Sequence, residues 1–501
     1  MRLQGITKNM ERDMTTKTDI SKVLQGALDM GASYADIRFK DINREHLCYE
    51  NGVLTNAVTT RSRGYGVRVY VDGSMGFAAS NDFSNIDGTV KQAYDIALAS
   101  RTMQSQKITL TEKDAAQGSY KTAVEKNPFQ TPLSEKLNLL KACETNMHKA
   151  WDSYNFVKKP TFHTYITLDS RTDDVIFADT DGSFIDQSFC QVAADVQAKV
   201  ITDDDSQTRT YVNVARGGFE CIEEMNLIER SYVLATEAAQ LSEAPDCPSG
   251  DFDLVITPRQ LFLQIHESVG HPTELDRVLG SEAAFAGRSF LEPDNITTKP
   301  VVYGSEHVTI VADATCPKGL GTFAYDDEGV PAQNITLIDK GKFTGFQTSR
   351  DNAEVLSQKS SGAGLSDGWH NLPIVRMTNI NLMPGSGTPD ELIAGIEYGF
   401  LFDENKSWSI DDLRINFQFA CEIAREIKDG KLTGKIFKNP IYSGITTEFW
   451  GSCDGVAGEE FWELVGVPNC GKGQPMQVMR VSHGSSPARF RKVKVGVSDV
   501  K

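Results

Sequence analysis

Hydrophobic and polar residues follow both helical and strand periods in the first part of the chain. Apolar residues recur at helical spacing in residues 19–30 and 85–100. Asn51-Gly52 and Asp72-Gly73 are pairs that favour tight hairpins. Between the two helical segments lie five short runs typical of β-strands: 34–39, 46–49, 53–59, 65–71 and 75–79. This order predicts an antiparallel sheet with helices, an α+β arrangement.

The pattern changes along the rest of the chain. Residues 103–133 are polar and predict a connector. Two further helices are expected at residues 134–151 and 221–241, with strands between them. After residue 280, short strands punctuated by glycine predict a barrel or a sandwich. We expect a disordered tail (1–18), an N-terminal α+β domain (19–245) and a C-terminal, mainly β domain (246–501), because 501 residues are too many for one compact core.

Residues 257–280 are predicted to form a helix that enters the C-terminal domain. Thr257 is a suitable N-cap, and Pro258 falls at the first helical position, where its missing N–H costs nothing. An apolar stripe then runs along one face of the helix. It consists of Leu261, Phe262, Ile265 and Val269.

The same helix carries His266, Glu267 and His271 in the spacing H-E-x-x-x-H. The zinc-protease pattern H-E-x-x-H places two His on one helix face, whereas positions five apart point about 140° away from each other on a regular helix. Both imidazoles can reach one ion only if the helix is distorted. Gly270 and Pro272 supply the means, so we predict a π-type turn or a kink at residues 269–272.

A catalytic zinc site needs a third protein ligand and an open position for water. Cys470 and Cys453 lie in Gly-containing segments, expected to be loops, that could bring a thiolate to the ion. Glu274 and Asp276 follow His271 closely enough to be ligands or hydrogen-bond partners of ligands. The residues alone leave these alternatives open. The acidic segment 326–329 is interpreted as a solvated turn, or alternatively as a substrate-positioning or second cation site.

Charge and cysteine content narrow the class of protein. A net charge of −17 and a pI near 5.0 argue against nucleic-acid or anionic-membrane partners. No apolar run is long enough for a transmembrane helix, and no signal peptide is recognisable at the N-terminus. Nine cysteines with scattered spacing do not form a disulfide framework, so we expect a cytoplasmic protein.

Several motifs, taken together in order, are similar to those of the TldD branch of the TldD/PmbA metalloproteases. They are the segment from His266 to Asp276, Asp-Asp-Glu-Gly at 326–329, Arg-Met-Thr-Asn at 376–379, Cys-Gly-Lys-Gly-Gln at 470–474 and the N-terminal segment 64–69. The resemblance implies zinc held by His266, His271 and Cys470, with Glu267 as catalytic base. It also implies unfolded or leader peptides as substrates and a PmbA/TldE-like subunit as partner, with a homodimer as the alternative.

The segment 481–490 departs from the family pattern. His483 within it is interpreted as a polar loop residue or, alternatively, as a residue beside the site, together with Glu274 and Asp276. In the expected mechanism Glu267 takes a proton from a zinc-bound water that attacks a peptide carbonyl. Arg489 and His483 are the candidates for stabilising the oxyanion. Pairing of an extended peptide with an exposed strand edge would give weak sequence preference.

Two other functions compete with a peptidase. The first is a regulatory subunit of a TldD/PmbA-type complex that binds peptides without cleaving them, which would have no need of Glu267. The second is a purely structural zinc site, which would need a fourth protein ligand such as His483 or Asp276.

Overall fold

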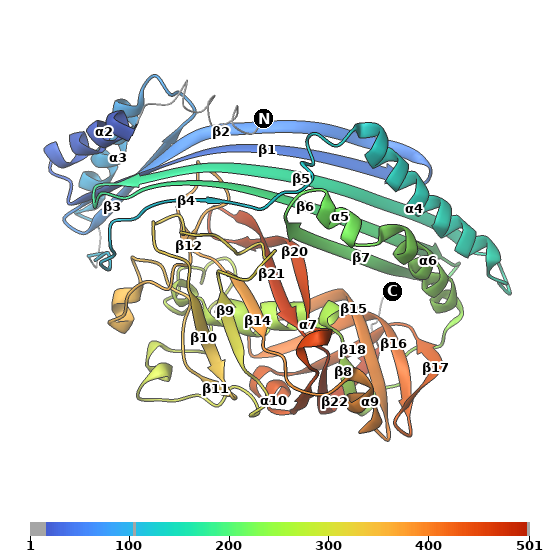
Figure 1. Cartoon of the computed structure of the whole chain (residues 1–501). Helices are drawn as coiled ribbons and strands as arrows, with labels where there is room; N and C mark the ends of the chain where they lie inside the picture. Colours follow the sequence, from blue (N-terminus) through green and yellow to red (C-terminus); the bar gives the residue numbers. More distant parts are fainter. Residues whose placement is uncertain (1–16, 104–106, 498–501) are drawn as a thin grey trace.

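The computed structural model describes residues 17–103 and 107–497, and the expected tail 1–18 therefore lies almost wholly outside the described residues. Figure 1 shows a long, curved sheet that arches over the second half of the chain. Its strand order is β3-β2-β1-β5-β6-β4, with β7 also paired to β6. The bounds are β1 Tyr34–Glu50, β2 Val53–Val71, β3 Ser74–Ser80, β4 Gln117–Lys121, β5 Thr161–Asp179, β6 Phe184–Ile201 and β7 Ser206–Arg216.

The strands of this sheet are longer than the sequence pattern predicts. Runs expected as 34–39 and 46–49 join into β1, and 53–59 and 65–71 join into β2. The polar residues between the runs do not end the strands, because ion pairs compensate their charges. Asp41 of β1 pairs with Arg61 of β2, and Lys40 lies 2.8 Å from Asp327 of the C-terminal half. Asn51 and Asp72 have positive φ, as does the glycine after each, so both predicted hairpin turns are confirmed.

Helices cover the convex side of the arch at its two ends (Figure 1). At one end α2 (Lys17–Asp29) and α3 (Ile86–Ser100) pack on a core that includes Phe39, Tyr65 and Val67. At the other end, α4 (Leu133–Ser153) packs against α6 (Leu227–Glu243). The helix predicted at 221–241 is broken, because Asn226 adopts a left-handed conformation between α5 (Glu220–Glu224) and α6.

The C-terminal half contains a closed five-stranded barrel, which confirms the predicted α+β class and the mainly β character of this half. The barrel closes because β15 pairs with both β8 and β16. Strands β17 and β19 pair with β16 and β22 at its periphery. The bounds are β8 Gly250–Ile256, β15 Tyr398–Ile410, β16 Asn416–Lys428, β17 Lys431–Phe437, β18 Pro440–Ile445, β19 Cys453–Val456 and β22 Ala488–Val497.

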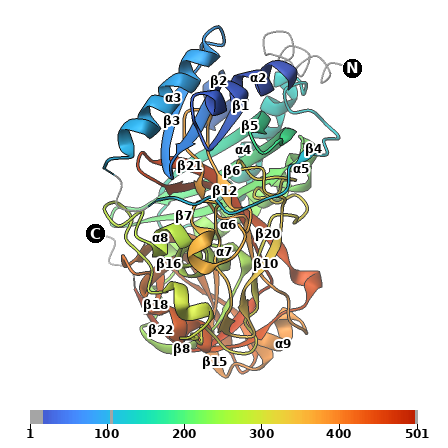
Figure 2. The same cartoon turned by 90° about the vertical axis from the view of Figure 1, so that its left-hand side faces the viewer.

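A second sheet, in the order β11-β10-β9-β14-β21-β20, lies beside the barrel, and α7 lies between β20/β21 and β15 (Figures 1 and 2). Its strands are β9 Ile310–Asp313, β10 Asn334–Asp339, β11 Lys342–Phe343, β14 Asn379–Leu382, β20 Glu463–Lys472 and β21 Gln477–Ser485. The remaining α-helices are α7 Pro258–Ile265, α8 Leu275–Val278, α9 Pro389–Ala394 and α10 Thr446–Gly451. Two short strands, β12 Gly364–Leu365 and β13 Ile374–Val375, form a pair of their own. Short 3₁₀ turns lie at His271–Thr273, Pro293–Ile296, Ala353–Leu356 and Glu459–Phe461. No helix in the described part of the chain is long and apolar enough to cross a membrane.

The acidic segment 326–329 is buried, so its interpretation as a solvated turn is wrong. The Asp326 carboxylate accepts hydrogen bonds from the backbone N–H groups of Glu328, Val330 and Gly364 and shapes the turn. Glu328 lies 2.6 Å from Arg68 of β2, and Asp327 pairs with Lys40 of β1. The acidic segment therefore joins the C-terminal half to cations of the N-terminal sheet, and these contacts account for its charges without a second metal ion.

Candidate metal centre

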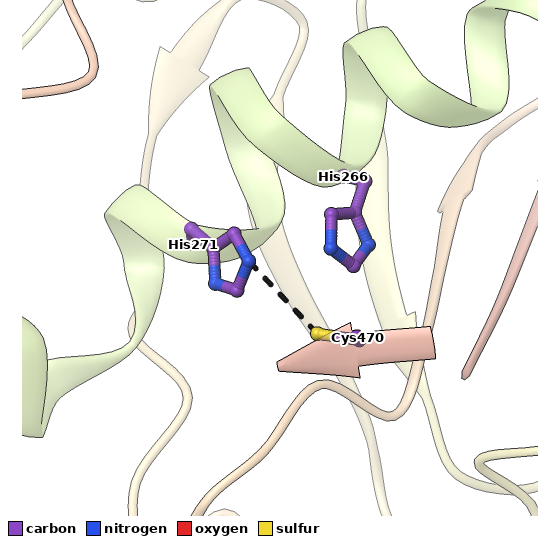
Figure 3. Close-up of side chains that lie close together, drawn as sticks. All are labelled: His266, His271 and Cys470. Carbon is purple, nitrogen blue, oxygen red and sulfur yellow. Dashed lines mark hydrogen bonds between the residues drawn. The ribbon is translucent and has the colours of Figure 1, made fainter. Parts of the chain in front are cut away.

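The helix that carries the two predicted histidine ligands is distorted where they lie. Helix α7 continues into a π-helical turn, His266–Gly270, in which the His271 N–H donates to the His266 carbonyl five residues earlier. A 3₁₀ turn, His271–Thr273, follows. The predicted π-type distortion is confirmed, although it begins three residues earlier than expected. The extra residue in the turn brings the imidazoles of His266 and His271 to one side, with ring centroids 4.7 Å apart (Figure 3).

Gly270 is needed for space rather than for an unusual backbone conformation. Its φ of −56° and ψ of −63° are helical, so the turn does not depend on a backbone conformation that only glycine adopts. A β-carbon built on Gly270 would instead lie 2.4 Å from the Sδ atom of Met377. The π-helical turn thus packs directly against the thioether of Met377.

Cys470 lies on strand β20 and not in the expected loop. A register shift between Val467 and Cys470 marks an irregularity just before this residue. The Cys470 Sγ is 3.9 Å from the His271 Nε2, and one ligand atom from each of His266, His271 and Cys470 lies within 4.8 Å of the others (Figure 3). Ligand atoms of a tetrahedral zinc site lie about 3.5 Å apart, so a small contraction would suit an ion. Cys453 is on β19, outside this cluster.

The neighbours of His266 determine which of its nitrogens is free. The His483 Nδ1 lies 3.2 Å from the Ile380 carbonyl, which can only accept, so this nitrogen carries the proton. Burial lowers the pKa of His483 well below its ordinary value, and the ring is therefore neutral. Its Nε2 then accepts the Nδ1–H of His266 at 2.8 Å. The lone pair of His266 Nε2 is left available for a metal ion.

His271 is oriented in a similar way by Glu274. The Glu274 Oε2 accepts the Nδ1–H of His271 at 2.9 Å, which leaves Nε2 facing Cys470. Burial lowers the pKa of His271 well below its usual value, so the imidazole is neutral, as a ligand must be. Lys472 in turn lies 3.3 Å from Glu274 and 2.7 Å from Asp276, and is itself fully buried. The lysine two residues after Cys470 thus links β20 to the segment that follows His271.

The Cys470 thiol has the electrostatic surroundings of a metal ligand. Burial by itself would raise the pKa of this thiol, but the nearby positive charge of Arg376 opposes burial, and the pKa lies below its ordinary value. The Arg376 side chain also donates a hydrogen bond to the Cys470 carbonyl at 2.6 Å. By contrast, burial raises the pKa of Cys453 to about 12. The surroundings therefore favour the thiolate form of Cys470 and the thiol form of Cys453.

Glu267 lines a cavity of about 650 Å³, and His266, His271 and Cys470 line the same cavity. Its walls come from α7, β15 and β20, and from Asp195, Thr210 and Val212 of the N-terminal half. The Glu267 Oε2 lies 2.7 Å from the Arg414 Nη1. Arg414 was not among the residues predicted for the site, because it follows two acidic residues, Asp411 and Asp412, and belongs to no recognisable motif.

Neither candidate for oxyanion stabilisation faces this cavity. Arg489 lies on β22, where its guanidinium bonds the Asp454 carboxylate at 2.7 Å. His483 is fully buried behind His266. The expectations for these two residues as oxyanion donors are therefore wrong, whereas the alternative placement of His483 beside the site agrees with the structure.

Replacing His483 with phenylalanine is expected to weaken zinc binding by roughly 10–100-fold, because the Nδ1–H of His266 loses its acceptor. Zinc affinity measured by competition with a chromophoric chelator would test this prediction. His483→Gln, whose carbonyl oxygen can accept the same hydrogen bond, should recover part of the loss. Equal affinity of the phenylalanine variant and the unchanged protein would show that the His266–His483 contact does not support the site.

Two parts of the sequence match domains of known metallopeptidases. Residues 35–97 match the description "PmbA/TldA metallopeptidase domain 1", and residues 249–497 match "PmbA/TldA metallopeptidase C-terminal domain". A protein named "Metalloprotease" from Methanothermobacter thermautotrophicus is 29% identical over 92% of this chain and 95% of its own length. A "Zinc metalloprotease TldD homolog" from Saccharolobus solfataricus is 21% identical, over 95% and 99% respectively.

The fold has solved counterparts as well. The crystal structure of TldE from Thermococcus kodakarensis superposes with a TM-score of 0.70 at 15% identity, over 95% of this chain and 99% of that one. This likeness concerns the fold alone. The matches in both halves of the sequence show that the chain is a member of the PmbA/TldD family of metallopeptidases.

Proposed function

We propose that this protein is the zinc-bearing, TldD-type member of its family and that it hydrolyses peptide bonds. The convergence of His266, His271 and Cys470 next to Glu267 in one cavity carries the proposal. Two neutral imidazoles and a thiolate suit zinc. A zinc ion there would polarise a substrate carbonyl and lower the pKa of water.

Glu267 would act as the general base. Its carboxylate lines the cavity and lies on the π-helical turn that carries both histidines, so it can take a proton from the attacking water. The same carboxyl would then give the proton to the leaving amine. A cluster of only three metal-ligand side chains in the described part of the chain supports a catalytic over a structural site, because a structural zinc needs four ligands.

The strand edges around the cavity support an extended, unfolded peptide as substrate. The pairing of β15 with β8 ends at Phe402, and the part of β15 beyond it contributes Asn405 and Trp408 to the wall. On the opposite side β20 pairs with β21 only, within the described residues, and contributes Gly466–Gly471. Main-chain pairing with such edges would hold many sequences alike. The family supports a TldE-like partner subunit, and the cysteine content favours the cytoplasm.

This function is tested by comparing the unchanged protein with Glu267→Gln. Both the zinc content and the rate of cleavage of an unfolded peptide are measured. We expect Glu267→Gln to retain zinc and to cleave roughly 10²–10⁴-fold more slowly, which is the usual contribution of a general base. The assay is run with and without a TldE-like subunit, and Glu354→Gln, at an exposed position, is the control. Equal cleavage by Glu267→Gln would exclude Glu267 as the base. Absence of cleavage by the unchanged protein in both conditions would favour a peptide-binding regulator instead.

A further inference from the structure

The turn between β15 and β16 is built to present one arginine to the catalytic cavity. The Asp411 carboxylate accepts hydrogen bonds from the N–H groups of Ile415 and Asn416, and the Asp411 carbonyl accepts the N–H of Arg414. Arg414 has a φ of 65°, a left-handed conformation that residues with a side chain rarely adopt. The Thr446 hydroxyl donates to the Arg414 carbonyl at 2.7 Å. The backbone of Arg414 is thus held in an unfavourable conformation by several independent contacts, which often marks a functional position.

A second segment braces this turn from the other side. The N–H groups of Arg288 and Phe290 donate to the carbonyls of Asp412 and Leu413, at 2.7 and 2.9 Å. A β-carbon on Gly287, whose φ is 79°, would lie 2.4 Å from the Asp412 carbonyl oxygen, so only glycine permits this approach. The Ala286 carbonyl then accepts from the Arg414 Nη2 at 3.2 Å. The Nη2 end of the guanidinium is therefore held by the Ala286 carbonyl, independently of the contact that Arg414 makes with Glu267.

The other end of the guanidinium holds the carboxylate of Glu267. Nη1 of Arg414 lies 2.7 Å from Oε2 of Glu267, and both side chains are mostly buried, 13% and 7% exposed. No hydrogen bond to Oε1 of Glu267 is present in the described part of the chain, and both residues line the cavity. One carboxylate oxygen is occupied by arginine, and the other is free for a water molecule. An ion pair that served stability alone would not need to leave one acceptor open toward the cavity.

We propose that Arg414 is the positioning residue of the general base: it fixes the Glu267 carboxylate so that Oε1 alone faces the attacking water. The inference rests on the proposed peptidase function and extends it to a residue outside the metal-binding motif. Because Arg414 acts through Glu267 and not through the metal, its loss should slow turnover while leaving zinc and substrate affinity in place. A carboxylate misplaced by about 1 Å can lower a rate by about 100-fold.

The test compares Arg414→Met with the unchanged protein in zinc content, kcat and KM. We expect one zinc per chain in both, a kcat lower by roughly 10–100-fold and a KM within about threefold. In cobalt-substituted protein, the thiolate-to-metal absorption band should be unchanged, which shows independently of activity that Cys470 is undisturbed. Arg414→Lys, and free guanidinium ion added to Arg414→Met, should each restore part of kcat.

The matched control is Arg489→Met, which breaks another partly buried arginine–carboxylate pair, with Asp454, away from the cavity. It is expected to leave kcat and KM unchanged. An unaltered kcat in Arg414→Met, a rise in KM alone, or loss of zinc would each overturn the positioning role while the proposed function stands. If the unchanged protein cleaves no peptide although it binds zinc, the proposed function fails first and the role of Arg414 fails with it.

Discussion

Replacing Cys470 with alanine is expected to abolish stoichiometric zinc binding and peptide cleavage together. Two imidazoles would remain, and the thiolate charge that offsets half of the ion's charge in this buried cluster would be gone. We expect the zinc affinity to fall by more than about 100-fold, because a loss of that size is the most that is usual when only a hydrogen-bond partner of a ligand is changed. Metal analysis after dialysis, with peptide cleavage measured on the same samples, checks both effects.

Cys453→Ala is the matched control for this prediction. Cys453 is as buried as Cys470 and also lies on a strand, but it is outside the metal-ligand cluster. Its removal should cost some stability and leave the zinc content at one per chain. Full retention of zinc by Cys470→Ala would exclude the thiolate as a ligand, and the proposed centre would then have to be abandoned.

Replacing Arg68 with methionine is expected to cause the largest loss of stability, about 3–5 kcal/mol, because it leaves buried carboxylates without their cation. Arg68 lies 2.7 Å from Asp36 on the neighbouring strand and 2.6 Å from Glu328 of the C-terminal half, and all three side chains are nearly inaccessible. Equilibrium unfolding in urea, followed by tryptophan fluorescence, would measure the difference. The variant should also loosen the contact between the two halves of the chain.

The pH dependence of this loss provides an internal check. Burial raises the pKa of Asp36 even with Arg68 present. Without the arginine the pKa rises further, so the folded variant binds a proton at a pH where the unfolded chain does not. Lower pH then favours the folded variant, and its deficit in stability should shrink as the pH falls. A deficit that is below about 1 kcal/mol, or that grows toward acid pH, would contradict the role given to Arg68. Arg68→Lys, which keeps the charge, should lose less.

Local features of this protein were readable from neighbouring residues. The H-E-x-x-x-H spacing predicts a π-type turn, because no regular helix brings His266 and His271 together, and the turn is present. Asn51-Gly52 and Asp72-Gly73 predict hairpins from the backbone preferences of two residues each. The short, glycine-separated strands of the second half predicted a barrel or a sandwich, and a barrel is present. For the π-type turn and the hairpins, the determining interactions lie within a few residues of one another, whereas the barrel strands pair across long stretches of the chain.

The sequence patterns did not predict contacts between segments that lie far apart along the chain. Residues on their own could not choose between Cys470 and Cys453, and the family resemblance was needed to favour Cys470. His483 and Arg414 meet the metal helix across 217 and 147 residues of chain. The acidic segment 326–329 looked solvated because its cationic partners lie on β1 and β2.

The sequence by itself determined the π-type turn in the helix that carries His266 and His271, the hairpins and the α+β class, because short-range backbone sterics and periodicity govern them. Only the tertiary structure decided which thiol joins the histidines, which nitrogen of each imidazole is free and what holds Glu267. Those outcomes depend on burial and on pairings between segments far apart along the chain. The free energy of such pairings depends on how far the surrounding protein shields the paired groups from water, and a local sequence pattern does not contain this information.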